Sequence, residues 1–159
     1  MLGTEKDWSR EMEKPRPFLT AALLCERVLQ EKDGTLTAVR IVDKMGYSLQ
    51  GLPEGLNLKP SLPVACLISL KSGPVSGTHK IKLFIQRPNG ERKEVFARDF
   101  EFLGNELGQN IIMNLVIGAE QEGVHWFELA FDEEVLTKFP FTIERLQEEE
   151  SPGQSSESR

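Results

Sequence analysis

His79-Lys-Ile-Lys-Leu-Phe-Ile-Gln86 is the stretch that decides the fold of this 159-residue chain. Apolar and polar side chains alternate through it, and only Phe84 interrupts the polar series Lys80, Lys82 and Gln86. Successive side chains of a strand point to opposite faces, so a period of two predicts a strand with one buried face. Pro88-Asn-Gly90 follows and is typical of a tight turn between paired strands.

Short apolar segments of the same kind continue on both sides of this hairpin, separated by turn-forming residues. They cover residues 18–29, 35–42, 62–70, 94–102, 110–117, 124–131 and 135–143. The first segment is apolar on both faces, so it reads as a central strand or a buried helix. The turn sequence Glu31-Lys-Asp-Gly34 and the β-branched residues after it favour a hairpin. About eight strands at this spacing predict an all-β fold, an antiparallel two-sheet sandwich of immunoglobulin-like type.

The phase of each segment predicts which residues face the core. We expect the inward residues to be Ile81, Leu83 and Ile85; Phe96, Phe100 and Phe102; His125, Phe127, Leu129 and Phe131; and Phe139, Phe141 and Ile143. Pro140 has no N–H to donate, so the last strand should lie at an edge or carry a bulge there.

Three regions divide the chain by composition. We predict a flexible leader at residues 1–16, a β-sandwich domain at residues 17–146 and a disordered acidic tail at residues 147–159, which lacks large apolar residues. Inside the domain, residues 46–62 contain several glycines and prolines and read as a long loop. Such loops often carry function, and the alternative is a simple crossover between sheets.

The overall composition is that of an ordinary globular protein, with 39% hydrophobic and 28% charged residues. The net charge of -6 and the pI near 5.1 argue against nucleic-acid binding, which needs a basic surface. The N-terminal residues lack the apolar core of a signal peptide, and no segment has the length of a membrane span. We therefore expect a cytoplasmic protein without membrane contact, whose Cys25 and Cys66 are reduced and buried.

No recognisable catalytic motif occurs in the chain. The two histidines, His79 and His125, lie in phase with apolar residues and read as structural. No Cys-x-x-Cys, His-x-His or His-Glu-x-x-His spacing is present, so we expect neither zinc nor another cofactor, and no enzymatic activity. Pairs of carboxylates can assemble in space and stay open as an alternative.

Calcium is a more specific alternative than zinc, because loops at one end of some β-sandwiches bind calcium through clustered aspartates. The acidic residues concerned are Asp33, Asp43, Asp99 and the run Asp132-Glu-Glu134. Calcium needs six to eight oxygen ligands, so these scattered residues read instead as solvated turn residues. We predict no metal site.

Two aromatic residues fall on faces that should be polar. Phe84 shares its face with Lys80 and Lys82, and Trp126 alternates with the phenylalanines of its segment. Aromatic side chains on an outer face suggest a protein-binding surface, formed by these four residues. The alternative is that a tail or the long loop covers the aromatic pair.

The chain resembles an uncharacterised bacterial family of small cytosolic β-sandwich proteins, a domain of unknown function. The resemblance rests on residues 24–44, on Arg87-Pro-Asn-Gly-Glu91 and on residues 122–143. It implies a bacterial β-sandwich and supplies no catalytic residues.

The sequence thus favours a non-enzymatic interaction module that binds a protein partner through an outer sheet face or the 46–62 loop. A small-molecule or carbohydrate-binding domain, or an unrecognised hydrolase, using loops at one end, is the alternative. The sequence leaves the oligomeric state open.

Overall fold

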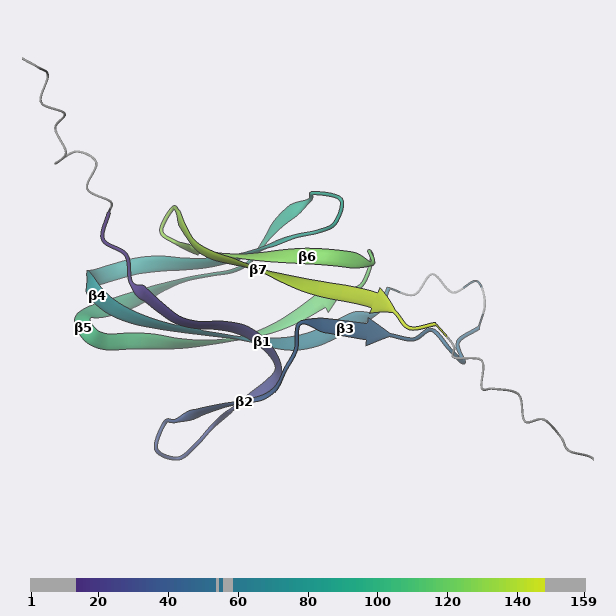
Figure 1. The fold of residues 1–159 in the computed structure, drawn as a ribbon, viewed down its shortest axis with the longest axis horizontal. Coiled ribbons are helices and arrows are strands. Elements are labelled where there is room, and N and C mark those ends of the chain that lie inside the picture. Colours follow the sequence, from purple (N-terminus) through teal and green to yellow (C-terminus); the bar gives the residue numbers. More distant parts are fainter. Residues whose placement is uncertain (1–13, 54, 56–58, 148–159) are drawn as a thin grey trace, which may run out of the picture.

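The computed structural model describes residues 14–53, 55 and 59–147 (Figure 1). Within these residues the chain is all-β, as the alternation predicted, and it contains no helix that could cross a membrane. The seven strands are β1 (Phe18–Gln30), β2 (Leu36–Ile41), β3 (Lys44–Tyr47), β4 (Ser61–Gln86), β5 (Arg92–Gly118), β6 (Gly123–Phe131) and β7 (Glu134–Arg145). The predicted leader up to residue 13 and the tail from residue 148 lie outside the described residues.

The strands form one continuous hydrogen-bonded sheet in the order β2-β1-β4-β6-β7-β3, with β5 paired to β4 outside this path. The pairs are antiparallel, except that β3 runs parallel to β7. The prediction of a purely antiparallel sheet was therefore wrong. Residues 44–47 belonged to or adjoined the predicted long loop, and they become a strand by pairing with the far end of the chain.

Two strands are far longer than predicted. β4 pairs with β5 from Ser61 opposite Gly118 to Gln86 opposite Arg92, with register irregularities between Lys71 and Ser76. Residues 72–77 and 104–108, which separate segments that the sequence predicts as distinct strands, therefore lie inside continuous strands. The glycines and the proline in these stretches coincide with bulges. Pairing between the two strands continues on both sides of them.

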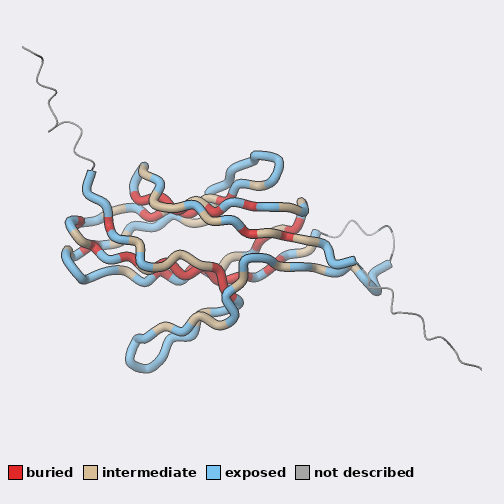
Figure 2. Tube along the Cα trace, in the orientation of Figure 1, coloured by how far each residue is buried: buried red, intermediate tan, exposed pale blue. Residues whose placement is uncertain are grey.

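These long strands carry the sheet from one layer to the other (Figure 1). The first half of β4 pairs with β1, whereas its second half pairs with β6. The β4–β5 pairing resumes beyond the register irregularities, so the two layers belong to one sheet. The hairpin of β1 and β2 projects from the body (Figure 2), and its turn has Gly34 at φ 87°, as predicted for residues 31–34.

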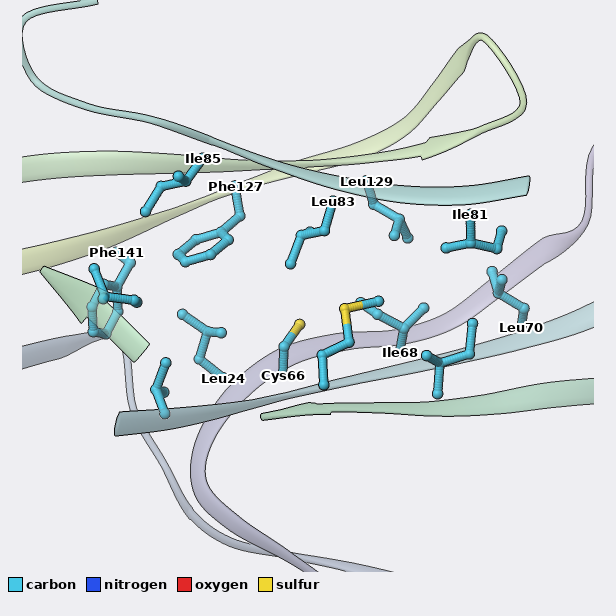
Figure 3. Packing of buried hydrophobic residues seen from close by; sticks show 14 of the residues in the cluster. Leu24, Cys66, Ile68, Leu70, Ile81, Leu83, Ile85, Phe127, Leu129 and Phe141 are labelled. Atoms are coloured by element: carbon cyan, nitrogen blue, oxygen red, sulfur yellow. The ribbon is translucent and has the colours of Figure 1, made fainter. Parts of the chain in front are cut away.

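The core lies between the two layers. Figure 3 shows Leu24, Cys66, Ile68 and Leu70 of one layer facing Ile81, Leu83, Ile85, Phe127 and Leu129 of the other. The alternation in residues 79–86 is confirmed, because Ile81, Leu83 and Ile85 are buried. The phases of β6 and β7 are confirmed as well, since Phe127, Phe141 and Ile143 are fully buried.

Both cysteines are buried and free. Cys25 is opposite Ala65, and Cys66 is opposite Leu24, so the thiols are on opposite faces of the β1–β4 pair. Burial raises the pKa of Cys66 to about 12, and the neighbouring Cys25 adds to this effect. Each cysteine thus packs as a small apolar residue.

Candidate functional site

The outer face of β4, β6 and β7 brings the two predicted aromatic residues together. Phe84 is opposite Glu128, and Trp126 is opposite both Gln86 and Pro140. A hollow of about 270 Å³ opens between them, lined by Phe84, Gln86, Arg92, Trp126, Glu128 and Lys138. We call this set of six residues the Trp126 face.

Arg92 organises the Trp126 face. Its guanidinium carbon lies 3.6 Å from the centre of the Phe84 ring, and its Nη2 donates to Glu128 Oε1 at 2.7 Å. Glu128 also pairs with Lys138, whose Nζ is 3.5 Å from the second carboxylate oxygen. The cation–π contact and the two ion pairs fix the guanidinium before any ligand arrives.

The same contacts stabilise the ionised form of Glu128. Burial raises the pKa of this carboxyl group, but the hydrogen bond and charge of Arg92, together with Lys138, outweigh burial and lower the pKa overall. The carboxylate stays ionised at neutral pH and cannot supply a proton. Glu128 is therefore a charged hydrogen-bond acceptor at the centre of the face.

The aromatic residues differ in exposure. Trp126 is 43% exposed, whereas Phe84 is half-buried beneath the Arg92 guanidinium. No described terminal or loop residue lines the hollow beside Trp126. The indole is the large apolar group that the face offers to a partner.

Lys80 and Lys82 lie on the same face of β4 but beyond the hollow. Lys80 is 3.8 Å from Asp99, and Lys82 is 3.9 Å from Glu133. The structure thus places all four predicted site residues on one face, and only Phe84 and Trp126 line the hollow. Sequence analysis missed Glu128, which shares the phase of Trp126, and Arg92, whose position depends on cross-strand register.

The 46–62 loop contributes nothing to the Trp126 face among its described residues. Its first residues belong to β3, and Ser48, Leu49 and Gln50 line a separate hollow with Arg145 and Leu146. Residues 54 and 56–58 lie outside the described part of the chain.

A second hollow, of about 350 Å³, contains His79, Phe131 and Asp132 beside Pro74 and Glu134. His79 Nδ1 lies 2.7 Å from Asp132 Oδ2, and its Nε2 lies 2.8 Å from the carbonyl oxygen of Ser76. Both partners are hydrogen-bond acceptors, so the arrangement favours the doubly protonated form of the ring. The hydrogen bond to Asp132 raises the pKa of His79 accordingly.

This arrangement decides what His79 can do. A general base or a metal ligand needs a free nitrogen lone pair, and an imidazolium that donates from both nitrogens has none. His79 also stacks on Phe131, with 4.7 Å between ring centres. In this arrangement His79 links the end of the Ser76–His79 segment to the turn at Asp132, and both of its ring nitrogens are engaged.

His125 is also a core residue. Its Nδ1 lies 3.1 Å from the carbonyl oxygen of Gly123, and its Nε2 has no hydrogen-bond partner among the described residues. Burial lowers its pKa, which the Gly123 carbonyl partly opposes. The ring is therefore neutral at neutral pH, and it lies on the face of β6 opposite to Trp126.

The acidic turn residues serve local structure. Asp33 accepts from the Thr35 amide at 2.9 Å, and Asp132 accepts from the Lys80 amide at 3.0 Å. Among residues 14–53, 55 and 59–147, no three side chains of the metal-binding types come together. Asp33 and Asp132 thus stabilise turns, and Asp99 and Glu133 lie in ion pairs with Lys80 and Lys82.

No protein-family model matches the chain, and no curated protein matches its sequence. Similar solved structures include a beta-glucosidase from Listeria innocua, at 9% identity and a TM-score of 0.46. The same enzyme in complex with isofagomine gives 10% identity and a TM-score of 0.43. In both cases the match covers 80% of this chain and 16% of the other. This likeness is too distant to carry a functional argument.

Proposed function

We propose that the protein is a non-enzymatic β-sandwich module that binds a protein partner through the Trp126 face. The observation that carries the proposal is the half-exposed indole beside a hollow with a prearranged guanidinium. Tryptophan and arginine are the residues most enriched at binding hot spots. Lys80 and Lys82 would form part of the polar rim around this centre.

The fixed geometry of Arg92 supports tight binding. A side chain that is already held by Phe84 and Glu128 loses little rotamer freedom when a partner docks. Residues from four adjacent strands, β5, β4, β6 and β7, make up the face, so a rigid scaffold positions it. We further propose that the two layers act as an immunoglobulin-like sandwich in the cytoplasm, a compartment that suits two free thiols. Membership of the bacterial family remains a prediction from the sequence resemblance.

The test compares the wild type with Trp126→Ala and with the matched control Val135→Ala, which truncates another exposed apolar residue of the same sheet. Each purified protein is used to capture binding proteins from lysate of the native host. We expect a protein that the wild type and the control retain and the Trp126 variant loses. Circular dichroism of each variant verifies the fold.

The captured protein is then purified and titrated by calorimetry. Loss of a hot-spot tryptophan costs about 2 kcal/mol or more, so the affinity should fall by at least about 30-fold. Equal affinity of wild type and Trp126→Ala would exclude the Trp126 face as the binding site. Retention of the same proteins by all three baits would do so as well.

A carbohydrate ligand is the second candidate, because the hollow combines an indole with the amide of Gln86 and the charged groups of Arg92 and Glu128. Its volume of about 270 Å³ is at the lower limit for a small-molecule site, which favours the protein partner. A sugar should change the fluorescence of Trp126 in a Trp8→Phe background. Saturable changes with a sugar panel, absent in Trp126→Ala, would replace the protein-binding proposal.

A further inference from the structure

β5 pairs on one side only, with β4, and its other edge has no strand neighbour in the described structure. The other free stretches of edge in the described structure are shorter: β2 has six residues, β3 has four, residues 18–24 of β1 pair only with β4, and residues 134–141 of β7 pair only with β6. β5 has 27 residues. A free edge of this length presents a row of unpaired N–H and C=O groups, which can template another strand.

The two halves of this edge differ in charge. The half that pairs with the second part of β4 carries the charged residues Arg92, Lys93, Glu94, Arg98, Asp99 and Glu101. The other half, Gly108-Gln-Asn-Ile-Ile-Met-Asn-Leu-Val-Ile-Gly118, contains neither charge nor proline. Proteins usually protect edge strands with charged residues, prolines or covering segments. Only the first half has such protection.

The unprotected half also exposes apolar side chains. Ile112 is 36% exposed and Val116 is 72% exposed. Ile112 is opposite Leu67, and Leu67 is opposite Leu23 on β1, so one apolar row crosses three strands and ends at the free edge. A further strand added at this edge would continue the row.

The sequence at this edge is complementary to itself. Residues Asn110-Ile-Ile-Met-Asn114 read almost the same in both directions around Ile112. In an antiparallel pair of two copies centred there, each Ile112 would face the other. Asn110 would face Asn114 of the second copy, and Ile111 would face Met113. Within these five residues, polar residues meet polar ones and apolar residues meet apolar ones. Gln109 would face Leu115 in the next pair, and no like charges oppose each other.

We infer that the protein forms a symmetric homodimer in which residues 108–116 of β5 pair antiparallel across a two-fold axis at Ile112. A two-fold interface uses the same patch on both subunits, and the near-palindrome supplies this. The layer containing β1 would continue as one sheet through the dimer. The Trp126 face lies on the outer side of the other layer, so this inference does not rest on the proposed function.

The first test measures the mass of the full-length chain by sedimentation velocity, from about 1 to 100 μM, the range in which interfaces of modest size associate. We expect a concentration-dependent shift toward twice the monomer mass of 17.9 kDa. Ile112→Lys places two like charges face to face and should leave only monomer. Val135→Lys, which adds the same charge at an exposed residue of β7, should dimerise as the wild type does.

The second test fixes the register. Directly opposed residues in an antiparallel pair have Cα atoms about 4.5–5.5 Å apart, which suits a disulfide. Mild oxidation with diamide should convert Ile112→Cys into a covalent dimer. Val116→Cys should stay uncrosslinked, because its side chain would face Gly108 of the second copy. Thermal melts confirm that each variant is folded.

Three results would overturn the inference. The first is a wild type that stays monomeric at every concentration up to about 100 μM, which would mean a dimer dissociation constant well above that value. The second is a dimer that Ile112→Lys leaves intact, since the interface must then lie elsewhere. The third is crosslinking at Val116→Cys in place of Ile112→Cys, which would exclude the register centred on Ile112.

Discussion

His79 and Asp132 form a clamp between two parts of the chain that are distant in sequence. Asp132 lies in the turn between β6 and β7 with φ 51°, and it accepts from both the His79 ring and the Lys80 amide. Burial raises the pKa of Asp132, but these hydrogen bonds outweigh burial and lower it. The pair is therefore charged on both sides at mildly acidic pH.

The His79–Asp132 contact predicts that His79→Gln lowers the free energy of unfolding by an amount that depends on pH. The raised pKa means that the contribution of His79 to stability is complete below its ordinary pKa of 6.5 and is lost as pH rises through the folded-state value. The contribution of Asp132 is present above its ordinary pKa of 3.8 and is lost at lower pH. In urea denaturation, His79→Gln should therefore lower the free energy of unfolding more at pH 5.5 than at pH 8.5. We expect about 1 kcal/mol at the lower pH, because the partly exposed pair is screened by solvent.

His125 gives the stability of the wild type the opposite dependence on pH. Its pKa is lowered in the folded state, so stability falls as pH drops below 6.5. At that pH the unfolded chain binds a proton at His125 that the buried ring of the folded state does not bind. His125 is common to the wild type and the His79→Gln variant, so its effect cancels in their difference. An equal loss at both pH values would show that the His79–Asp132 pair contributes through packing alone.

At the scale of the strand, Gly108 lets β5 approach β4 closely. A Cβ atom at this position would overlap the carbonyl oxygen of Leu70 on the paired strand. Backbone atoms cannot move aside as a flexible side chain can, so the residue must lack a side chain. The requirement arises at the place where both strands are irregular and pass between the layers.

Gly108→Ala should consequently destabilise the protein by about 1–3 kcal/mol, the usual cost of forcing an extra methyl group into a packed site. Gly118→Ala is the matched control, because its Cβ would meet only the Glu120 side chain, at 3.9 Å. Urea midpoints of the two variants and the wild type provide the measurement. Equal midpoints for both variants would contradict the close approach.

At the scale of the molecule, β4 and β5 make the two layers one folding unit. Each strand contributes to both layers, so the two layers share two strands and are directly connected. The buried residues of the two layers also share one core. We expect a single cooperative unfolding transition.

Ile68→Ala tests this coupling, because Ile68 is fully buried in the layer opposite to Trp126. The truncation should cost about 2–5 kcal/mol. In a Trp8→Phe background, Trp126 fluorescence and far-UV circular dichroism should shift to the same lower urea midpoint. Val135→Ala, at an exposed position, should change stability by less than about 0.5 kcal/mol. A Trp126 transition that Ile68→Ala leaves unchanged would mean that the layers unfold separately.

The candidate site was only partly predictable. The phase of Trp126 and Phe84 follows from alternation within single strands, and the structure places both on one outer face. That Arg92 covers Phe84 and bridges to Glu128 depends on the β4–β5 and β4–β6 registers. Register is a relation between distant segments, which the pattern of one segment does not contain.

The sequence by itself determined the all-β class, the hairpin turns at residues 31–34 and 88–90, and the inward residues of β4, β6 and β7. These properties follow from the two-residue period and from turn chemistry, which are local. Only the tertiary structure decided that residues 61–86 form one strand through two layers and that β3 joins β7 in parallel. Long-range pairing overrode the local turn signals at Gly73 and Gly104, because each strand continued to find hydrogen-bond partners in the other beyond them.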